Sequence, residues 1–155
     1  MTSTVSAATM TVTVTESISL NGSNHGSTNT LSIGSINEVF KRIVTVTTTE
    51  AEILAFGTAI GAGTFDEAKV MYIRMTNLDD TNHIVLTFKS EGNHEFAVKL
   101  DKGQSFIYNG DLAGGVVDTM DASGSALSLA LEDLVNITAD ADTASCDMEI
   151  FVAST

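Results

Sequence analysis

Four apolar runs of strand length occupy the middle of the chain, between Val70 and Tyr108. Short polar segments rich in Asn, Asp, Ser and Gly separate these runs, at 77–82, 90–94 and 101–103. Runs of β-branched and aromatic residues with such boundaries are typical of strands joined by tight connections. In the second run three large apolar residues, Ile84, Leu86 and Phe88, occupy alternate positions. Because strand side chains point to alternate faces, the pattern predicts an antiparallel meander with one buried face.

The N-terminal segment shows the same alternation after a short polar stretch. Residues 1–9 are small and polar with little to bury, which predicts a flexible N-terminal arm. From residue 10 onward, apolar residues alternate with Thr and Ser as they do in a half-buried strand, at Met10, Val12, Val14, Ile18 and Leu20. Glu16 interrupts this apolar register. It indicates either an edge strand or intermolecular contact, or a local bulge.

Residues 39–48 form a strand pattern with apolar side chains on both faces. Phe40, Val44 and Val46 share one face, and Val39 and Ile43 lie on the other. A strand of this kind is covered on both sides, so we expect another layer or another subunit over part of it. The next segment, 50–56, fits one helical turn as well as a strand.

Further strand patterns follow a long connection at 109–124, and they complete an all-β chain. Leucines at 127, 129 and 131 alternate with small or polar residues, and strands are predicted at 134–141 and 148–152. The chain then has about nine strands, with turns at the spacing of sandwiches and barrels. We predict an antiparallel β-sandwich, jelly-roll-like, in which residues 10–155 form a single domain after a flexible N-terminal arm.

The charge balance narrows the classes of partner. Seven basic residues stand against 20 acidic ones, a net charge of −13. Binding to nucleic acid or to an anionic membrane surface needs clustered Lys and Arg, so neither is expected as a partner. The segment at the N-terminus lacks basic residues and no run reaches the ~20 apolar residues of a membrane helix. We expect synthesis in a host cytoplasm and later incorporation into a larger assembly.

Candidate chemistry is sparse. The glycine-rich stretch 57–63 lacks the Lys and Ser/Thr of a phosphate loop, and the acidic residues lack the alternating ligands of a calcium loop. Three histidines, at positions 25, 83 and 94, are scattered on predicted turns as solvated side chains. Cys146 is expected to be a small buried hydrophobic residue. We therefore expect no catalytic residue, no cofactor and no metal, and hence no enzyme.

One sequence pattern resembles that of a known class of proteins. The run 72–79, Tyr-Ile-Arg-Met-Thr-Asn-Leu-Asp, is followed by Asn82, Val85 and Leu86 and then by the run 100–106, Leu-Asp-Lys-Gly-Gln-Ser-Phe. This order resembles small virion structural proteins of tailed bacteriophages, especially those of marine bacteria, including cyanophages. The resemblance covers residues 10–155. It implies a jelly-roll-like capsid decoration or cement protein in the virion, often a homotrimer, whose partner is the major capsid protein or another virion protein.

Assembly on a shell requires buried area and shape rather than reactive groups. We expect the N-terminal segment 1–15 and the strand 39–46 to supply the contacts between subunits or with the shell. The candidate assembly contacts are Val12, Val14, Glu16, Val39, Phe40 and Ile43. The alternative is a tail- or fibre-associated β-domain that binds a receptor or glycan, and it requires polar or aromatic loop side chains grouped at one end of the sandwich.

Overall fold

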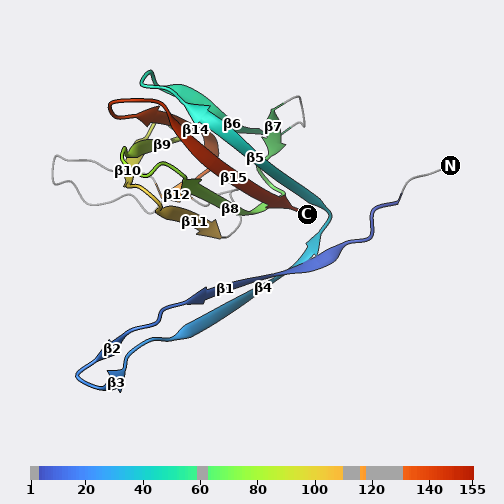
Figure 1. Cartoon of the computed structure of the whole chain (residues 1–155). Coiled ribbons are helices and arrows are strands. Elements are labelled where there is room, and N and C mark those ends of the chain that lie inside the picture. Colours follow the sequence, from blue (N-terminus) through green and yellow to red (C-terminus); the bar gives the residue numbers. More distant parts are fainter. Residues whose placement is uncertain (1–3, 59–62, 110–115, 118–130) are drawn as a thin grey trace. The chain divides into compact units, whose positions relative to one another are not determined.

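A computed structural model describes residues 4–58, 63–109, 116–117 and 131–155, and these residues contain strands and no helix (Figure 1). The predicted all-β class is confirmed. The strands are β1 (Ala8–Thr15), β2 (Ser19–Leu20), β3 (Ser23–Asn24), β4 (Thr28–Ile36), β5 (Glu38–Val46), β6 (Ala51–Gly57), β7 (Thr64–Asp66), β8 (Val70–Asn77), β9 (Ile84–Ser90), β10 (Glu95–Leu100), β11 (Ser105–Asn109), β12 (Val116–Val117), β13 (Leu131–Glu132), β14 (Leu134–Ala141) and β15 (Cys146–Ser154).

The chain divides into two compact units, one of residues 1–38 with Thr155 and one of residues 39–154. We call residues 4–38 the arm and residues 39–154 the sandwich. The observed division follows Glu38, whereas the boundary predicted from the sequence follows Thr9. The difference arises because the period-two segment that begins near Met10 pairs with β4, in a hairpin of its own, and not with a strand of the sandwich.

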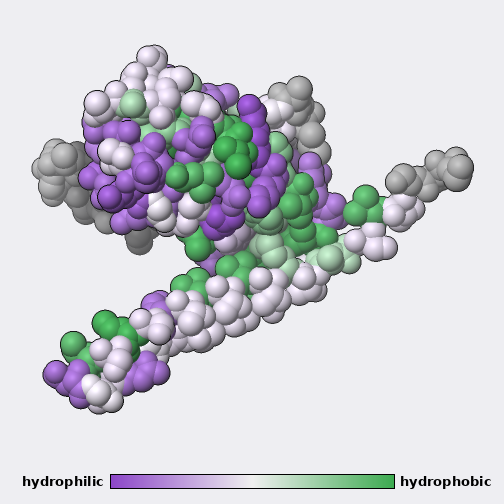
Figure 2. Space-filling model, in the orientation of Figure 1, coloured by the Kyte–Doolittle hydropathy of each residue, from purple (hydrophilic) through white to green (hydrophobic). Residues whose placement is uncertain are grey.

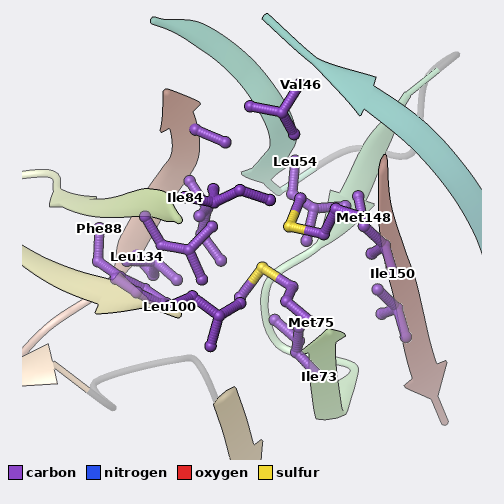
Figure 3. Close-up of a cluster of buried hydrophobic side chains, with 14 of the residues drawn as sticks. Val46, Leu54, Ile73, Met75, Ile84, Phe88, Leu100, Leu134, Met148 and Ile150 are labelled. Carbon is purple, nitrogen blue, oxygen red and sulfur yellow. The ribbon is translucent and has the colours of Figure 1, made fainter. Parts of the chain in front are cut away.

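Two large sheets of the sandwich surround one core, and β12 pairs with β13 in a separate two-stranded sheet. The strand order is β11-β8-β15-β5 in the four-stranded sheet and β10-β9-β14-β6-β7 in the five-stranded sheet. The pairs β9–β10, β8–β11, β6–β14, β9–β14 and β8–β15 are antiparallel, and β6 with β7 is parallel. One continuous cluster of buried side chains contains residues from both sheets, as Figure 3 shows for Met75 and Ile150 of one sheet and Ile84 and Phe88 of the other.

The predicted alternation is confirmed in the central strands. Ile84, Leu86 and Phe88 of β9 are buried, and the intervening side chains of the strand are only partly covered. Burying each of these side chains contributes roughly 1.5–3 kcal/mol. Phe88 also stacks on Phe96 of β10, with ring centroids 4.7 Å apart. Cys146 is fully buried and unpaired, as expected, and burial raises the pKa of its thiol.

The predicted meander is wrong, because the four central strands are shared between the two sheets. β9 pairs with β10 in the five-stranded sheet, and β8 pairs with β11 in the other. The connections 78–83 and 101–104 therefore carry the chain from one sheet to the other, and only 91–94 closes a hairpin within a sheet. Apolar periodicity specifies which face of a strand is buried, and it does not specify which neighbour the strand pairs with.

Asn77, at the end of β8, connects the two crossing segments. Its side chain is completely buried and donates to the carbonyl oxygens of Asn82, at 2.9 Å, and Leu100, at 3.1 Å. Its Oδ1 accepts the N–H of Asp79. Its backbone N–H donates to Gln104, so one residue joins the turn after β8 to the turn before β11.

Two other expectations concern particular segments. Residues 51–57 form β6, so the strand alternative holds for this segment. The leucines at 127 and 129 lie outside the described residues, and Leu131 begins β13. Within the described part of the chain, no helix has the length and apolar character to cross a membrane.

Candidate assembly surfaces

The arm is a two-stranded ribbon with two chemically different faces. In the β1–β4 register, Thr11 lies opposite Ser32 and Thr13 lies opposite Thr30, so one face carries hydroxyl groups. The residues between them form the other face, which is apolar: Met10, Val12, Val14, Leu31 and Ile33. Sequence alternation predicted the two faces of β1, but it assigned no partner to this strand.

The apolar residues of the arm become more exposed toward the turn that joins β2 and β3. Ile33 and Ile36, at the other end of β4, are buried. Toward the tip, Val14 is 44% exposed, Leu31 is 41%, Ile18 is 53% and Leu20 is 58%. We call these four residues the distal apolar patch. Figure 2 shows apolar side chains along this ribbon and at its tip. Apolar side chains grouped on so small an element make it a candidate interaction surface.

Glu16 lies just past the end of β1, where the ribbon narrows. Its N–H donates to the carbonyl oxygen of Ser27 at 2.9 Å, and its carboxylate accepts the Ser27 hydroxyl at 2.7 Å. Gly26 sits against this pair: a Cβ at position 26 would lie 2.1 Å from the carbonyl oxygen of Glu16. The charged interruption in the strand pattern thus coincides with a close approach of the two backbones.

β5 supplies a second surface, on the sandwich. It is the outer strand of the four-stranded sheet, and no described strand pairs with its other edge. Val39, 56% exposed, and Ile43, 58% exposed, point away from the core. Between them Lys41 contacts Glu149 of β15 at 3.0 Å. A long outer strand with exposed apolar residues presents unpaired backbone groups and apolar area together.

Phe40, another predicted contact, lies on the core side of β5. It is partly buried and packs against the hydrophobic core. Its ring meets that of Phe65 edge-on, with the two ring centroids 5.3 Å apart. Its expected role in assembly stays a prediction, and its observed contacts are structural. Of the other predicted contacts, Val12 and Val14 share the apolar face of the arm, and Glu16 lies beside it.

Glu149 is the centre of an ionic group on the outer face of the four-stranded sheet. Its carboxylate accepts from Arg74 of β8 and lies 3.0 Å from the Lys41 ammonium of β5. The Arg74 hydrogen bond, with that of Lys41, holds the pKa of Glu149 below its ordinary value. The group links three neighbouring strands, so β5 is attached to its sheet by side chains as well as by backbone bonds.

A second polar group surrounds Glu132 of β13, at the turn between β9 and β10. The Glu132 carboxylate accepts from the hydroxyl of Ser90 and lies 3.0 Å from Nδ1 of His94. A Cβ at Gly92 would lie 2.1 Å from Glu132 Oε1, so any larger residue would displace the carboxylate from this position. The Ser90 and His94 contacts lower the pKa of Glu132. These contacts fasten the turn to β13.

The sequence did not predict the Glu132 group, since His94 was expected to be a solvated turn residue. Its partner lies 38 positions away in the chain, and no local pattern marks the pair. A shallow recess of about 360 Å³ adjoins the group, with a lining that includes Lys89, Asn93 and Asn136. No set of three or more potential metal-ligating side chains occurs in the described ranges.

Comparisons with known proteins assign no family. No family model matches the chain, and no curated protein matches it. Among solved structures, the chain is similar to one from Bacillus endospore appendages, described as a novel family of disulfide-linked pili. The two are 12% identical, the match covers 76% of this chain and 85% of that chain, and the TM-score is 0.41. A likeness of this extent carries no argument about function.

Proposed function

We propose that this chain is a phage virion structural protein, a capsid decoration or cement protein that binds the outside of the head. It stabilises the head through contacts with the major capsid protein or another virion protein, without acting as an enzyme. The observation that carries the proposal is the arm, a separate two-stranded ribbon whose distal apolar patch is exposed. The resemblance of residues 72–106 to phage virion proteins supplies the biological setting.

The division of labour between the two units supports this role. All the residues of the hydrophobic core cluster lie between Val46 and Val152, so the arm contributes none of them. A two-stranded hairpin by itself is only marginally stable in water. An element that adds nothing to the core and keeps apolar area in solvent gains stability when another protein covers it. Such an element suits a protein that attaches to a shell.

The experiment compares the full chain with a variant lacking residues 1–38 on purified phage particles. Quantitative mass spectrometry should find on the order of hundreds of copies of the chain per particle, because a symmetric capsid repeats each binding site many times. Particles stripped of the protein should rebind the full chain and not the shortened one. The shortened chain should keep its cooperative thermal transition, which separates lost attachment from lost folding.

Absence of the chain from particles, or a copy number of only a few, would refute the proposed location on the head. The second candidate, a tail- or fibre-associated receptor-binding domain, is favoured by one feature, the polar recess beside His94 and Asn136. A low copy number together with glycan binding that His94→Ala abolishes would support that candidate instead.

A further inference from the structure

The structure points to a specific partner for the arm. We propose that the distal apolar patch of one copy docks along β5 of a second copy, with Glu16 beside Lys41 of that copy. The inference deepens the proposed assembly role and names its partner, and it rests on that role only for its biological setting.

Charge separates the arm from the rest of the molecule. Only two of its residues are charged, Glu16 and Glu38, although the whole chain carries 20 acidic and seven basic residues. Two sandwiches would therefore repel each other over most of their surfaces. The arm is the segment that approaches a second sandwich with the least repulsion, and its distal part brings one carboxylate, that of Glu16.

β5 has the complementary arrangement. Lys41 is exposed on the outer face of the strand, between the exposed Val39 and Ile43 of the same face. It belongs to the ionic group of Glu149, which contains two basic side chains and one carboxylate. Glu16 lies between two residues of the distal apolar patch in sequence. Apolar area with one acidic group thus faces apolar area beside a group of net positive charge, which is the complementarity that selects a partner and an orientation.

The backbone favours the same contact. β5 has an unpaired edge among the described strands, and the two-stranded arm has an outer edge on each of its strands. Addition of a strand to an exposed sheet edge is a common mode of recognition, since main-chain hydrogen bonds form along the whole edge. The arm would at the same time lose the marginal stability of an isolated hairpin.

This contact is heterologous, because each copy offers its arm and receives another. Repetition of such a contact closes into a ring or continues as a filament, according to the rotation between neighbours. A trimer is the closed form that we expect. A two-fold pair formed by arm against arm would use different residues, and the test below distinguishes the two arrangements.

The test is a charge-reversal cycle on the full chain, followed by sedimentation velocity over a concentration series. Glu16→Arg and Lys41→Glu should each weaken self-association by about tenfold or more, and the double variant should restore most of the affinity. Glu91→Arg, which reverses an exposed charge on the β9–β10 turn, is the matched control and should leave association unchanged.

An uncharged comparison tests the apolar part of the contact. Ile43→Thr keeps a β-branched residue in β5 but removes apolar area, and it should weaken association. Val135→Thr makes the same change at an exposed position of β14, in the other sheet, and should have no effect. Thermal transitions of all variants should match that of the wild type, which shows that folding is intact.

Three results would overturn the inference. A wild-type chain that remains monomeric up to roughly 100 µM has no such contact. A double variant no better than the single ones shows that Glu16 and Lys41 do not meet. Weakening by Glu16→Arg without an effect of Ile43→Thr indicates contact between two arms. Each result is independent of particle binding, so the virion proposal and the present one can fail separately.

Discussion

Asn77 is a polar side chain in a completely buried position, and each of its side-chain polar atoms has a partner. Buried polar groups are costly when unpaired, so the cost of removing one member falls on the groups left behind. Here the carbonyl oxygens of Asn82 and Leu100 would lose their donor. The residue therefore determines how two connections between the sheets are held, although it adds no apolar area.

We predict that Asn77→Ala lowers the free energy of unfolding by roughly 2–4 kcal/mol, through lost hydrogen bonds and unpaired carbonyls. Asn77→Asp should destabilise more at neutral pH, because it sets a carboxylate against two carbonyl oxygens, and acid should reverse part of that loss. Urea unfolding at pH 7 and pH 5 measures both effects.

Asn37→Ala, at an exposed position between β4 and β5, is the control and should change the free energy of unfolding by less than about 0.5 kcal/mol. Equal effects at positions 37 and 77 would contradict the assignment.

At the scale of elements, the arm folds through its own register and depends on a few close contacts. The approach of Gly26 to Glu16 is the tightest of these, and it involves backbone on both sides. Gly34, in the same β4 ribbon, has no heavy atom within 4 Å of an added Cβ and no unusual backbone angle. The two glycines therefore form a matched pair for substitution.

We expect Gly26→Ala to disrupt the outer part of the arm without affecting the sandwich. The amide protons of Glu16 and His25, which are bonded across this turn, should lose their protection in hydrogen exchange measured by NMR. Gly34→Ala should leave that protection unchanged, because the new methyl group meets nothing. A loss of protection in β9 or β15 with Gly26→Ala would show that the arm is not the separate unit described above.

The elements also show how far sequence reasoning reaches. Alternation identified the strands around Ile84 and Met148 and their buried faces, because it depends on neighbours two positions apart. It did not identify the sheet partners, since β15 pairs with the distant β8, where Met148 lies opposite Asn77 and Ser154 opposite Val70. The contact of His94 with Glu132 was missed for the same reason. Candidate contacts such as Ile43 could be predicted as apolar positions, but whether they face solvent depends on the complete fold.

For the molecule as a whole, the carboxylates govern the dependence of stability on pH. The pKa values of six carboxyl groups lie below their ordinary values, mainly through hydrogen bonds: Glu50, Asp66, Asp79, Asp101, Glu132 and Glu149. A group with a depressed folded pKa stabilises the fold above its unfolded pKa, and this stabilisation is lost as the pH falls through the folded pKa. The pKa of Glu67 is raised by burial and by nearby carboxylates, so its sign is opposite.

We predict that the free energy of unfolding decreases steadily below about pH 4. Glu149→Gln should lower stability at pH 7 and reduce the acid-dependent loss, because the ionised form is the one that Arg74 and Lys41 bind. Glu67→Gln should raise stability at pH 7 and make little difference in acid. Denaturant unfolding of the three proteins between pH 3 and pH 8 tests the signs. The same sign for both variants would refute the proposed origin of the acid sensitivity.

The position of β15 has a consequence for synthesis of the protein. This strand occupies residues 146–154 and lies between β8 and β5. Until β15 is synthesised, β5 therefore has no neighbour in the four-stranded sheet. A nascent chain on the ribosome can form the arm and the β9–β10 hairpin early. At that stage the edge of β8 that later pairs with β15 has no partner. Cotranslational folding must therefore wait for residue 154 to leave the exit tunnel, and until then holdase chaperones have an exposed strand to bind.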